Sequence, residues 1–212
     1  DVSPWANETG WSGQGQVTLP EMPVLNPPSA YWMFDETSGT IAYDSVGSNN
    51  GTLQGATLPT WSAGKYGSAV TFTASGQSVY VPHSPAIDFG NESFSVSMWT
   101  KQPVSYSGQY ELFIKGTIGS GSFPGSGKRY ELYRKDATFR FAIDDDVTKT
   151  EINVSTSGIC TGDWVHIVAV RDTAADHVRL YINGSPISTI ADNTGSISQS
   201  EPMYIGYAMY PG

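Results

Sequence analysis

The chain has 212 residues, enough for one large domain with a hydrophobic core, and its 23 Gly, 13 Pro and low charged fraction of 15% are typical of turns and strands. The formal net charge of −9 disfavours nucleic acid and anionic membranes as partners, because Lys and Arg carry phosphate binding. No apolar window of about 18 residues occurs, so we expect no membrane insertion. The single cysteine, Cys160, excludes an internal disulfide and a paired-cysteine metal site.

Residues 1–29 differ in composition from the rest of the chain. They hold five prolines and two tryptophans without an alternating apolar pattern. Proline at this density favours extended chain with few backbone partners. We expect a Pro-rich linker or an N-terminal arm over 1–29, followed by one domain over 30–212. Because the chain begins at Asp1 without a signal sequence, we also expect a mature or excised piece.

From residue 30 onward, apolar and polar residues alternate in short runs that Gly, Ser, Asn and Asp interrupt. Such runs predict about a dozen strands and therefore an all-β fold, a two-sheet antiparallel β-sandwich of the jelly-roll type. The predicted strands cover 31–34, 41–43, 67–72, 78–82, 93–101, 110–116, 129–135, 139–143, 151–154, 164–170, 178–182 and 203–209.

The clearest structural signal lies between Trp164 and Ile187. Residues 164–170 are apolar on both faces of an extended chain, which favours a central strand between packed layers. The next run, 177–182, alternates with period two and ends at Asn183-Gly184, a pair that favours a type I′ hairpin turn. We expect the indoles of Trp32, Trp99 and Trp164 to lie in the core.

Four stretches in this order carry a family resemblance: WMFDETSGTIAYDSVGSNNGTLQGA, YGSAVTF, SFSVSMWTK and WVHIVAVRDTAADHVRLYINGSPI. Together they make residues 30–207 similar to the laminin-G-like, concanavalin-A-like lectin/glucanase domains of modular secreted proteins. The resemblance implies a two-sheet jelly roll, often with calcium and often binding glycans. It also implies a secreted or extracellular location, with other domains of the same protein as partners.

The resemblance is incomplete at the C-terminal end. Similar domains finish with a strand of the type F-x-G-x-I-D-E-V-R-I-Y, which packs beside the first strand and often supplies a metal-ligand Asp, whereas this chain stops at Gly212. We therefore expect the last family strand to be missing from the chain. Either the fragment was cut there, or another chain supplies the strand. The first strand would then have an unpaired edge, and the metal site would be incomplete.

A calcium site is predicted in the loop from Asp44 to Gly51. Calcium takes carboxylate, amide and carbonyl oxygens, and a Gly-rich loop with one Asp and two Asn offers all three kinds. The resemblance implies Asp44 as a ligand, with Asn49, Asn50 and Gly51 near it. The alternative is a turn of the Asx type that needs no ion. A second acidic cluster, 144–146, we interpret as a solvated turn.

The segment Lys128–Lys135, together with Arg140, contains five of the eleven basic residues. Alternation predicts Arg129, Tyr133 and Lys135 on one strand face with Glu131. With Arg140 alongside through strand pairing, the face would suit the carboxylate or sulfate of an acidic polysaccharide. The alternative is ordinary solubilising charge. The candidate glycan residues here are Tyr133, Arg134 and Arg140.

Neutral glycans need flat aromatic faces with polar groups at the ring edges. The aromatic residues outside the clear strand cores are Trp61, Tyr106, Tyr110, Tyr207 and Tyr210. These five positions are therefore candidates for stacking against sugar rings, with no ranking among them.

Catalysis has little support in the sequence. Glucanases of this fold carry paired carboxylates on one strand, in a run of the type E-x-D-x-x-E, whereas Glu111, Glu131 and Glu151 stand apart here. His166 shares a face with Trp164 and Val168, which favours a core histidine. We therefore expect a non-catalytic, calcium-stabilised carbohydrate-binding module of a secreted multidomain protein that binds a polysaccharide or glycan. The alternatives are a jelly-roll polysaccharide lyase or glycoside hydrolase, and a protein–protein adhesion domain.

Overall fold

The computed structural model describes residues 27–117 and 127–211, with only the backbone for 207–211. The prediction for 1–29 therefore falls almost entirely outside the described residues. Within them the regular elements are antiparallel strands and one short 3₁₀ helix, Pro85–Ile87. The predicted all-β class is confirmed. None of the described helical structure is long and apolar enough to cross a membrane.

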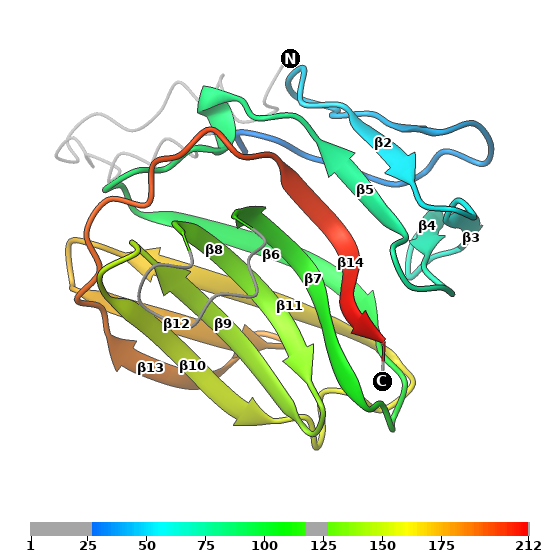
Figure 1. Ribbon diagram of the computed structural model, residues 1–212. Coiled ribbons are helices and arrows are strands. Elements are labelled where there is room, and N and C mark those ends of the chain that lie inside the picture. The colour runs from blue at the N-terminus through cyan, green and yellow to red at the C-terminus, as the bar shows by residue number, and fades with distance from the viewer. Residues whose placement is uncertain (1–26, 118–126, 212) are drawn as a thin grey trace, which may run out of the picture.

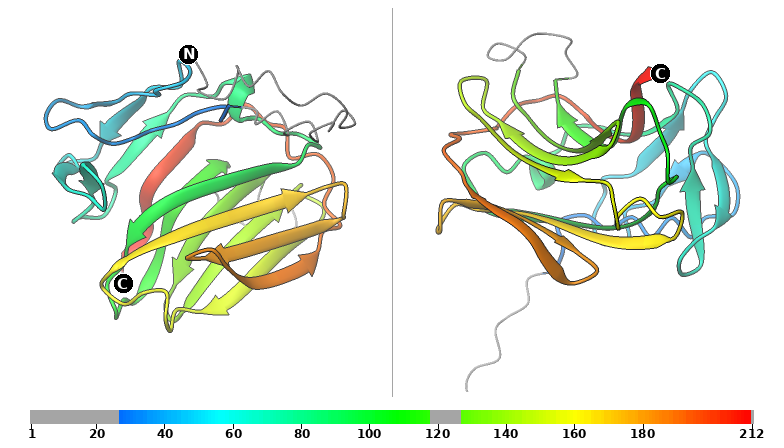
Figure 2. Two further views of the ribbon diagram at one scale, coloured as in Figure 1. Left: turned by 180° about the vertical axis from the view of Figure 1, so that it is seen from behind. Right: turned by 90° about the horizontal axis from the view of Figure 1, so that it is seen from below.

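Two sheets face each other as layers of a sandwich, and a small ribbon lies beside them (Figures 1 and 2). The eight-stranded sheet has the order β1 (Ile41–Ala42), β2 (Gly51–Gln54), β5 (Ser78–Val81), β14 (Met203–Pro211), β7 (Gly108–Gly116), β8 (Arg129–Lys135), β9 (Thr138–Asp144) and β10 (Lys149–Ser155). The four-stranded sheet has the order β13 (Ser185–Ala191), β12 (His177–Ile182), β11 (Trp164–Asp172) and β6 (Phe94–Lys101). The ribbon consists of β3 (Thr60–Ala63) and β4 (Ser68–Thr71).

The core lies between the two sheets. Successive side chains of a strand point to opposite faces, so every second residue enters the core. Ile167 and Leu180 of the smaller sheet are fully buried in one cluster with Phe139 and Phe141 of the larger sheet. Each such side chain contributes roughly 1.5–3 kcal/mol through burial.

The hairpin at the end of β12 is confirmed. Asn183 and Gly184 have φ angles of 49° and 79°, as a type I′ turn requires. The prediction that β11 lies between packed layers on both faces is wrong, however. Val165, Ile167 and Ala169 are buried, whereas the residues between them are only half-buried, so β11 has the core on one face only.

The predicted core position of Trp99 is also wrong, since 40% of the residue is exposed. Along β6, Phe94, Val96 and Met98 point towards the core, and Trp99 alternates with them. Its indole therefore lies on the outward face. Trp164 is half-buried on that face of β11, and Trp32 packs partly against a smaller cluster of Val81, Ile87 and Met203.

The N-terminal part of the domain departs most from the predicted strands. The predicted strand 31–34 forms a single bridge, Trp32 to Asp44. Strands β2 and β3 were not predicted. Gly51 permits β2 to lie close to β5, because a Cβ atom there would sit 2.4 Å from Val79 Cγ1.

Both edge strands of the smaller sheet, β6 and β13, have an unpaired side in the part of the chain that the structure describes. β6 pairs with β11, and no described strand pairs with its other side. The prediction of a missing family strand is not tested by this arrangement and stays a prediction.

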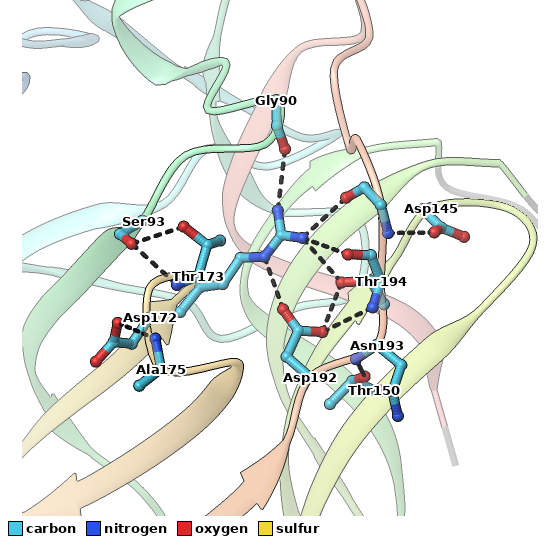
Figure 3. Close-up of polar contacts among 12 residues, drawn as sticks. Gly90, Ser93, Asp145, Thr150, Asp172, Thr173, Ala175, Asp192, Asn193 and Thr194 are labelled. Atoms are coloured by element: carbon cyan, nitrogen blue, oxygen red, sulfur yellow. Dashed lines mark hydrogen bonds and ion pairs between the residues drawn. The ribbon is translucent and has the colours of Figure 1, made fainter.

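A buried arginine connects the smaller sheet to the chain that leads into β14 (Figure 3). Arg171 on β11 is 2% exposed. Its Nε donates to Asp192 Oδ2 at 2.8 Å, and its two terminal nitrogens donate to the carbonyl oxygens of Gly90, Thr194 and Gly195 at 2.8–2.9 Å. Although burial raises the pKa of Asp192, hydrogen bonds from Thr194 and Arg171 outweigh it and lower the pKa.

We predict that Arg171→Met lowers the free energy of unfolding by about 3 kcal/mol, because it leaves the buried Asp192 carboxylate without its cation and several carbonyls without a donor. Urea denaturation measures the change. Arg179→Met is the matched control, since Arg179 pairs with Asp172 in a more exposed position on the adjacent strand. Equal effects of the two substitutions would contradict the stabilising role of Arg171.

Candidate functional site

The loop predicted to bind calcium is organised around the carboxylate of Asp44, which is 7% exposed. Oδ1 accepts the amides of Tyr31 at 2.9 Å and Val46 at 3.2 Å. Oδ2 accepts the amide of Asn49 at 3.0 Å and its Nδ2 at 2.7 Å. Asn50 Oδ1 in turn accepts the amide of Asp44 at 2.9 Å.

Four N–H donors therefore point at the Asp44 carboxylate, where a calcium ligand would need free oxygen lone pairs. Burial raises the pKa of Asp44, but these hydrogen bonds lower it to about 2. Within the described ranges, no three His, Cys, Asp or Glu side chains gather closely enough to hold a metal ion. The residues fit an ion-free Asx-type turn better than a calcium cage, and the calcium site stays a prediction.

Of the candidate glycan residues Tyr133, Arg134 and Arg140, Arg134 is wrong, because its side chain lies on the opposite face of the larger sheet from the other two. Arg134 is 1% exposed, and its terminal nitrogens donate to the carbonyl oxygens of Pro103 and Val104. A glycan cannot contact Arg134. Arg140 lies opposite Tyr133 on the outward face, with its guanidinium 5.8 Å from the ring centre, as the sequence predicted.

The other aromatic candidates are dispersed. Tyr106 and Tyr110 pack edge to face at 4.6 Å, with Tyr110 half-buried against the core. Trp61 lies on β3 of the ribbon and donates its indole N–H to the carbonyl of Gly39 at 3.0 Å. Tyr207 and Tyr210 are part of β14, but their side chains lie outside the described structure. Among the described side chains, no single glycan surface unites Trp61, Tyr106 and Tyr110 with Tyr133.

Strand pairing instead gathers charged residues on the outward face of β7–β10. Tyr133 lies opposite Arg140, Arg129 lies opposite Asp144, and Glu131 and Glu151 flank Ala142. Glu111 on β7 lies opposite Tyr133. We call this set the charge ladder: Glu111, Arg129, Glu131, Tyr133, Arg140, Asp144, Lys149 and Glu151.

Ion pairs connect neighbouring strands of the charge ladder. Arg129 contacts Asp144 at 3.0 Å and Glu131 at 3.1 Å. Glu151 accepts hydrogen bonds from the Tyr133 hydroxyl at 2.7 Å and from Arg140 at 3.1 Å, and it forms an ion pair with Lys149. The acidic segment 144–146 is therefore not simply a solvated turn, because Asp144 is fully buried here.

Glu111 is the one member of the charge ladder whose carboxyl group faces no described cation directly. It is fully buried; Oε1 accepts Gln109 Nε2 at 2.8 Å, and Oε2 has no hydrogen-bond partner in the described residues. Burial, followed by the charge of Glu131, raises the pKa of Glu111 to about 8. Each of the other three carboxyl groups of the ladder, Glu131, Asp144 and Glu151, contacts at least one of its cations.

Only the β9–β10 end of the charge ladder is accessible. The side chains of Arg140, Lys149 and Glu151 are 23%, 22% and 20% exposed, whereas Glu111 and Glu131 are at most 4% exposed. This end presents N–H donors beside a carboxylate, which suits the hydroxyl groups of a ligand. Glu111 and Glu131 would have to become exposed before they could contact a substrate.

We did not predict from the sequence a second cluster of side chains, which lies on the outward face of the smaller sheet around Trp99. Trp99 packs edge to face against Tyr66 at 5.8 Å and lies 5.1 Å from the ring of His166. His166 lies opposite Trp99 on this outward face, with its Nε2 2.8 Å from Ser97 Oγ, so the prediction of a core histidine is wrong. The signal was present in the sequence, because Trp99 alternates in register with Ser95, Ser97 and Lys101 rather than with the apolar residues of β6.

We predict that Asp44→Ala lowers the free energy of unfolding by about 2 kcal/mol at pH 7, because buried amides lose their acceptor. In the wild type the same contribution is present above pH 4 and is lost as the pH falls towards 2, since the folded-state pKa is depressed. Thermal melts from pH 2 to 7, with and without EDTA, measure both effects. An unchanged wild-type melting temperature in EDTA would contradict the calcium prediction.

We predict that Glu111→Gln removes a pH dependence of stability. The folded-state pKa of Glu111 lies above the ordinary 4.5, so the folded wild type binds a proton that the unfolded chain releases. Its stability relative to the Gln variant should therefore fall as the pH rises from about 5 to about 8. Glu201→Gln, on an exposed loop, is the control. Parallel pH profiles of the wild type and Glu111→Gln would show that Glu111 is ionised at neutral pH.

Comparison with solved structures shows the fold. The chain is similar to the receptor binding domain of botulinum neurotoxin D, with a TM-score of 0.60 and 13% identity over 84% of this chain and 46% of that one. It is also similar to the ligand binding domain of that serotype in complex with N-acetylneuraminic acid (TM-score 0.60, 14%, 81% and 41%). A third match is the binding domain of botulinum neurotoxin DC in complex with SialylT (0.51, 16%, 81% and 44%).

The chain thus spans less than half the length of these toxin domains, and identities this low support similarity of fold alone. No curated protein sequence matches it. The family model described as the concanavalin A-like lectin/glucanases superfamily (Laminin_G_3) matches residues 72–211, about two thirds of the chain. The predicted resemblance is confirmed, and the chain belongs to the concanavalin A-like lectin/glucanase superfamily.

Proposed function

We propose that this domain is a non-catalytic carbohydrate-binding module of a secreted multidomain protein. Its ligand contacts are Arg140, Lys149 and Glu151 at the accessible end of the charge ladder. Bound to a polysaccharide, such a module raises the local concentration of the domains attached to it. A stabilising calcium ion at the Asp44 loop is a separate hypothesis, and the chelator experiment above tests it.

The observation that supports the proposal most is that Arg140, Lys149 and Glu151 hold one another in place. Glu151 holds Arg140 and Lys149 through direct ion pairs, and both cations lie 5.8 Å from the Tyr133 ring centre. Side chains already held in place lose little conformational entropy when a ligand binds. Sugar hydroxyls both donate and accept hydrogen bonds, so they match a surface where donors and a carboxylate lie side by side.

The ion pairing at this site favours an uncharged saccharide. Both accessible cations already share the Glu151 carboxylate, so a sulfate or carboxylate ligand would have to compete with it. The sequence left open whether Tyr133, Arg134 and Arg140 bind an acidic polysaccharide or are ordinary solubilising charge. Neutral hydroxyl groups contact the existing pairs without separating them.

The structural neighbours support saccharide binding at the level of the fold. One botulinum neurotoxin D domain is described in complex with N-acetylneuraminic acid. The present chain covers 41% of that domain, so no binding residue is transferred from it. What supports the proposal is the occurrence of this fold within a saccharide-binding protein.

A glycoside hydrolase is the second candidate, because the sheet brings Glu111, Glu131 and Glu151 onto one face. Burial raises the pKa of Glu111, whereas hydrogen bonds with Lys149 and Tyr133 lower that of Glu151 against the effect of burial. Such opposed pKa values resemble those of an acid and a base. Release of reducing ends from a panel of neutral polysaccharides would support this candidate over a binding module.

We predict that Arg140→Ala weakens binding to a neutral oligosaccharide at least tenfold, about 1.4 kcal/mol, because a positioned donor is lost. A glycan array selects the oligosaccharide, and titration calorimetry measures the affinity. Lys135→Ala is the matched control, since it removes an equal charge at the exposed end of β8 and should bind as the wild type does. Absence of any bound glycan, or equal losses in both variants, would contradict the proposed site.

A further inference from the structure

The outward face of the four-stranded sheet carries exposed aromatic rings that neither the core nor the charge ladder uses. We call this cluster the Trp99 platform: Lys65, Tyr66, Ser97, Trp99 and His166. Trp99 is 40% and Tyr66 72% exposed. Large aromatic side chains exposed side by side are unusual on a surface without a partner, because each leaves much apolar area in water.

The platform is held in place from two directions. Ser97 on β6 and His166 on β11 lie 2.8 Å apart and support one side of Trp99. Tyr66 comes from the turn between β3 and β4, which closes through a hydrogen bond from the Gly64 amide to the Gly67 carbonyl at 3.0 Å. Since the rings are positioned before any ligand arrives, little ordering entropy remains to be lost on binding.

The polar groups left open on the platform are donors. Trp99 Nε1 has no acceptor, and Lys65 has no carboxylate within 4.0 Å, among the residues that the structure describes. Lys65 Nζ instead lies 5.2 Å from the Trp99 ring centre and 5.9 Å from that of Tyr66. The adjacent carboxylate, Asp35, accepts the Ser68 amide at 2.8 Å. Indole and ammonium groups can donate but not accept, so a fitting ligand supplies acceptor oxygens.

We propose that the Trp99 platform is a second saccharide site, and that it takes a sugar bearing a carboxylate. The apolar face of the pyranose ring would lie on the exposed part of Trp99, with the perpendicular Tyr66 ring beside it, and the carboxylate would accept from Lys65 in a charge-assisted hydrogen bond. The site is independent of the charge ladder, because it lies on the other sheet. Its ligand also differs, since Lys65 is an unpaired cation whereas Arg140 is not.

The test uses two probes of equal length, a glucuronate-containing tetrasaccharide and cellotetraose, followed through the indole N–H signals in ¹⁵N NMR spectra. Trp99→Phe assigns the Trp99 signal. The acidic tetrasaccharide should shift this signal, and Lys65→Gln should weaken its affinity about tenfold and reduce its salt dependence. The Trp61 signal is an internal control, because its N–H already bonds to Gly39. Arg140→Ala separates the two sites and should leave the Trp99 shift unchanged.

The proposal is overturned if the acidic tetrasaccharide leaves the Trp99 signal in place. It is also overturned if cellotetraose shifts that signal equally and Lys65→Gln has no effect, because the ligand would then not be anionic. Loss of the shift in Arg140→Ala would place binding at the charge ladder instead. Since Trp99 and Lys65 are exposed, the folded state of both variants can be checked by their unchanged amide spectra.

Discussion

Packing of the two inner sheet faces, with Phe139 and Phe141 on one side and Ile167 and Leu180 on the other, is the interaction on which the rest of the structure depends. Because strand residues alternate, filling one face with core residues leaves the other face free for different side chains. Both surfaces proposed here to bind saccharides are such outward faces. A substitution that moved a strand register by one residue would exchange core and surface residues on that strand.

Two charge networks show how burial decides the role of an arginine. Arg171 is enclosed, and its donors are taken up by Asp192 and by backbone carbonyls, so it holds connecting segments together. Arg140 is paired with Glu151 but remains partly exposed, so it is available to a ligand. Arg134, which the sequence did not distinguish from Arg140, is enclosed like Arg171. In this protein the accessible charges suit binding and the enclosed charges stabilise the fold.

In the loop at Asp44, metal binding competes with hydrogen bonding inside the loop. Its Asp, Ser, Asn and Gly residues offer oxygen atoms to an ion but also form turns of the Asx type. The backbone amides of Tyr31, Val46 and Asn49 converge on the carboxylate, together with the Asn49 side chain. The loop therefore has a complete internal set of hydrogen bonds. Such a turn can position the segment around Trp32 without a metal.

The residue pattern of the chain was sufficient for everything that depends on local alternation and turn chemistry. It predicted the all-β class, nearly all strands from β4 onward, the Asn183-Gly184 turn, the family and the placement of Tyr133 beside Arg140. It failed for β2, β3 and β13, because their sequences GTLQ, TWSA and SPISTIA show no clear alternation of apolar and polar residues. It also failed for segment 31–34, which is apolar but forms a single bridge.

Only the tertiary structure decided which face of each strand points to the core and which side chains contact one another on that face. Alternation separates Arg134 from Tyr133 without saying which of the two faces meets the core, and only sheet packing decides that. Likewise Glu111, Glu131 and Glu151 are separated by twenty residues each, and strand pairing alone brings them onto one face. Charge pairing, burial and shifted pKa values arise from such long-range contacts, which no local pattern contains.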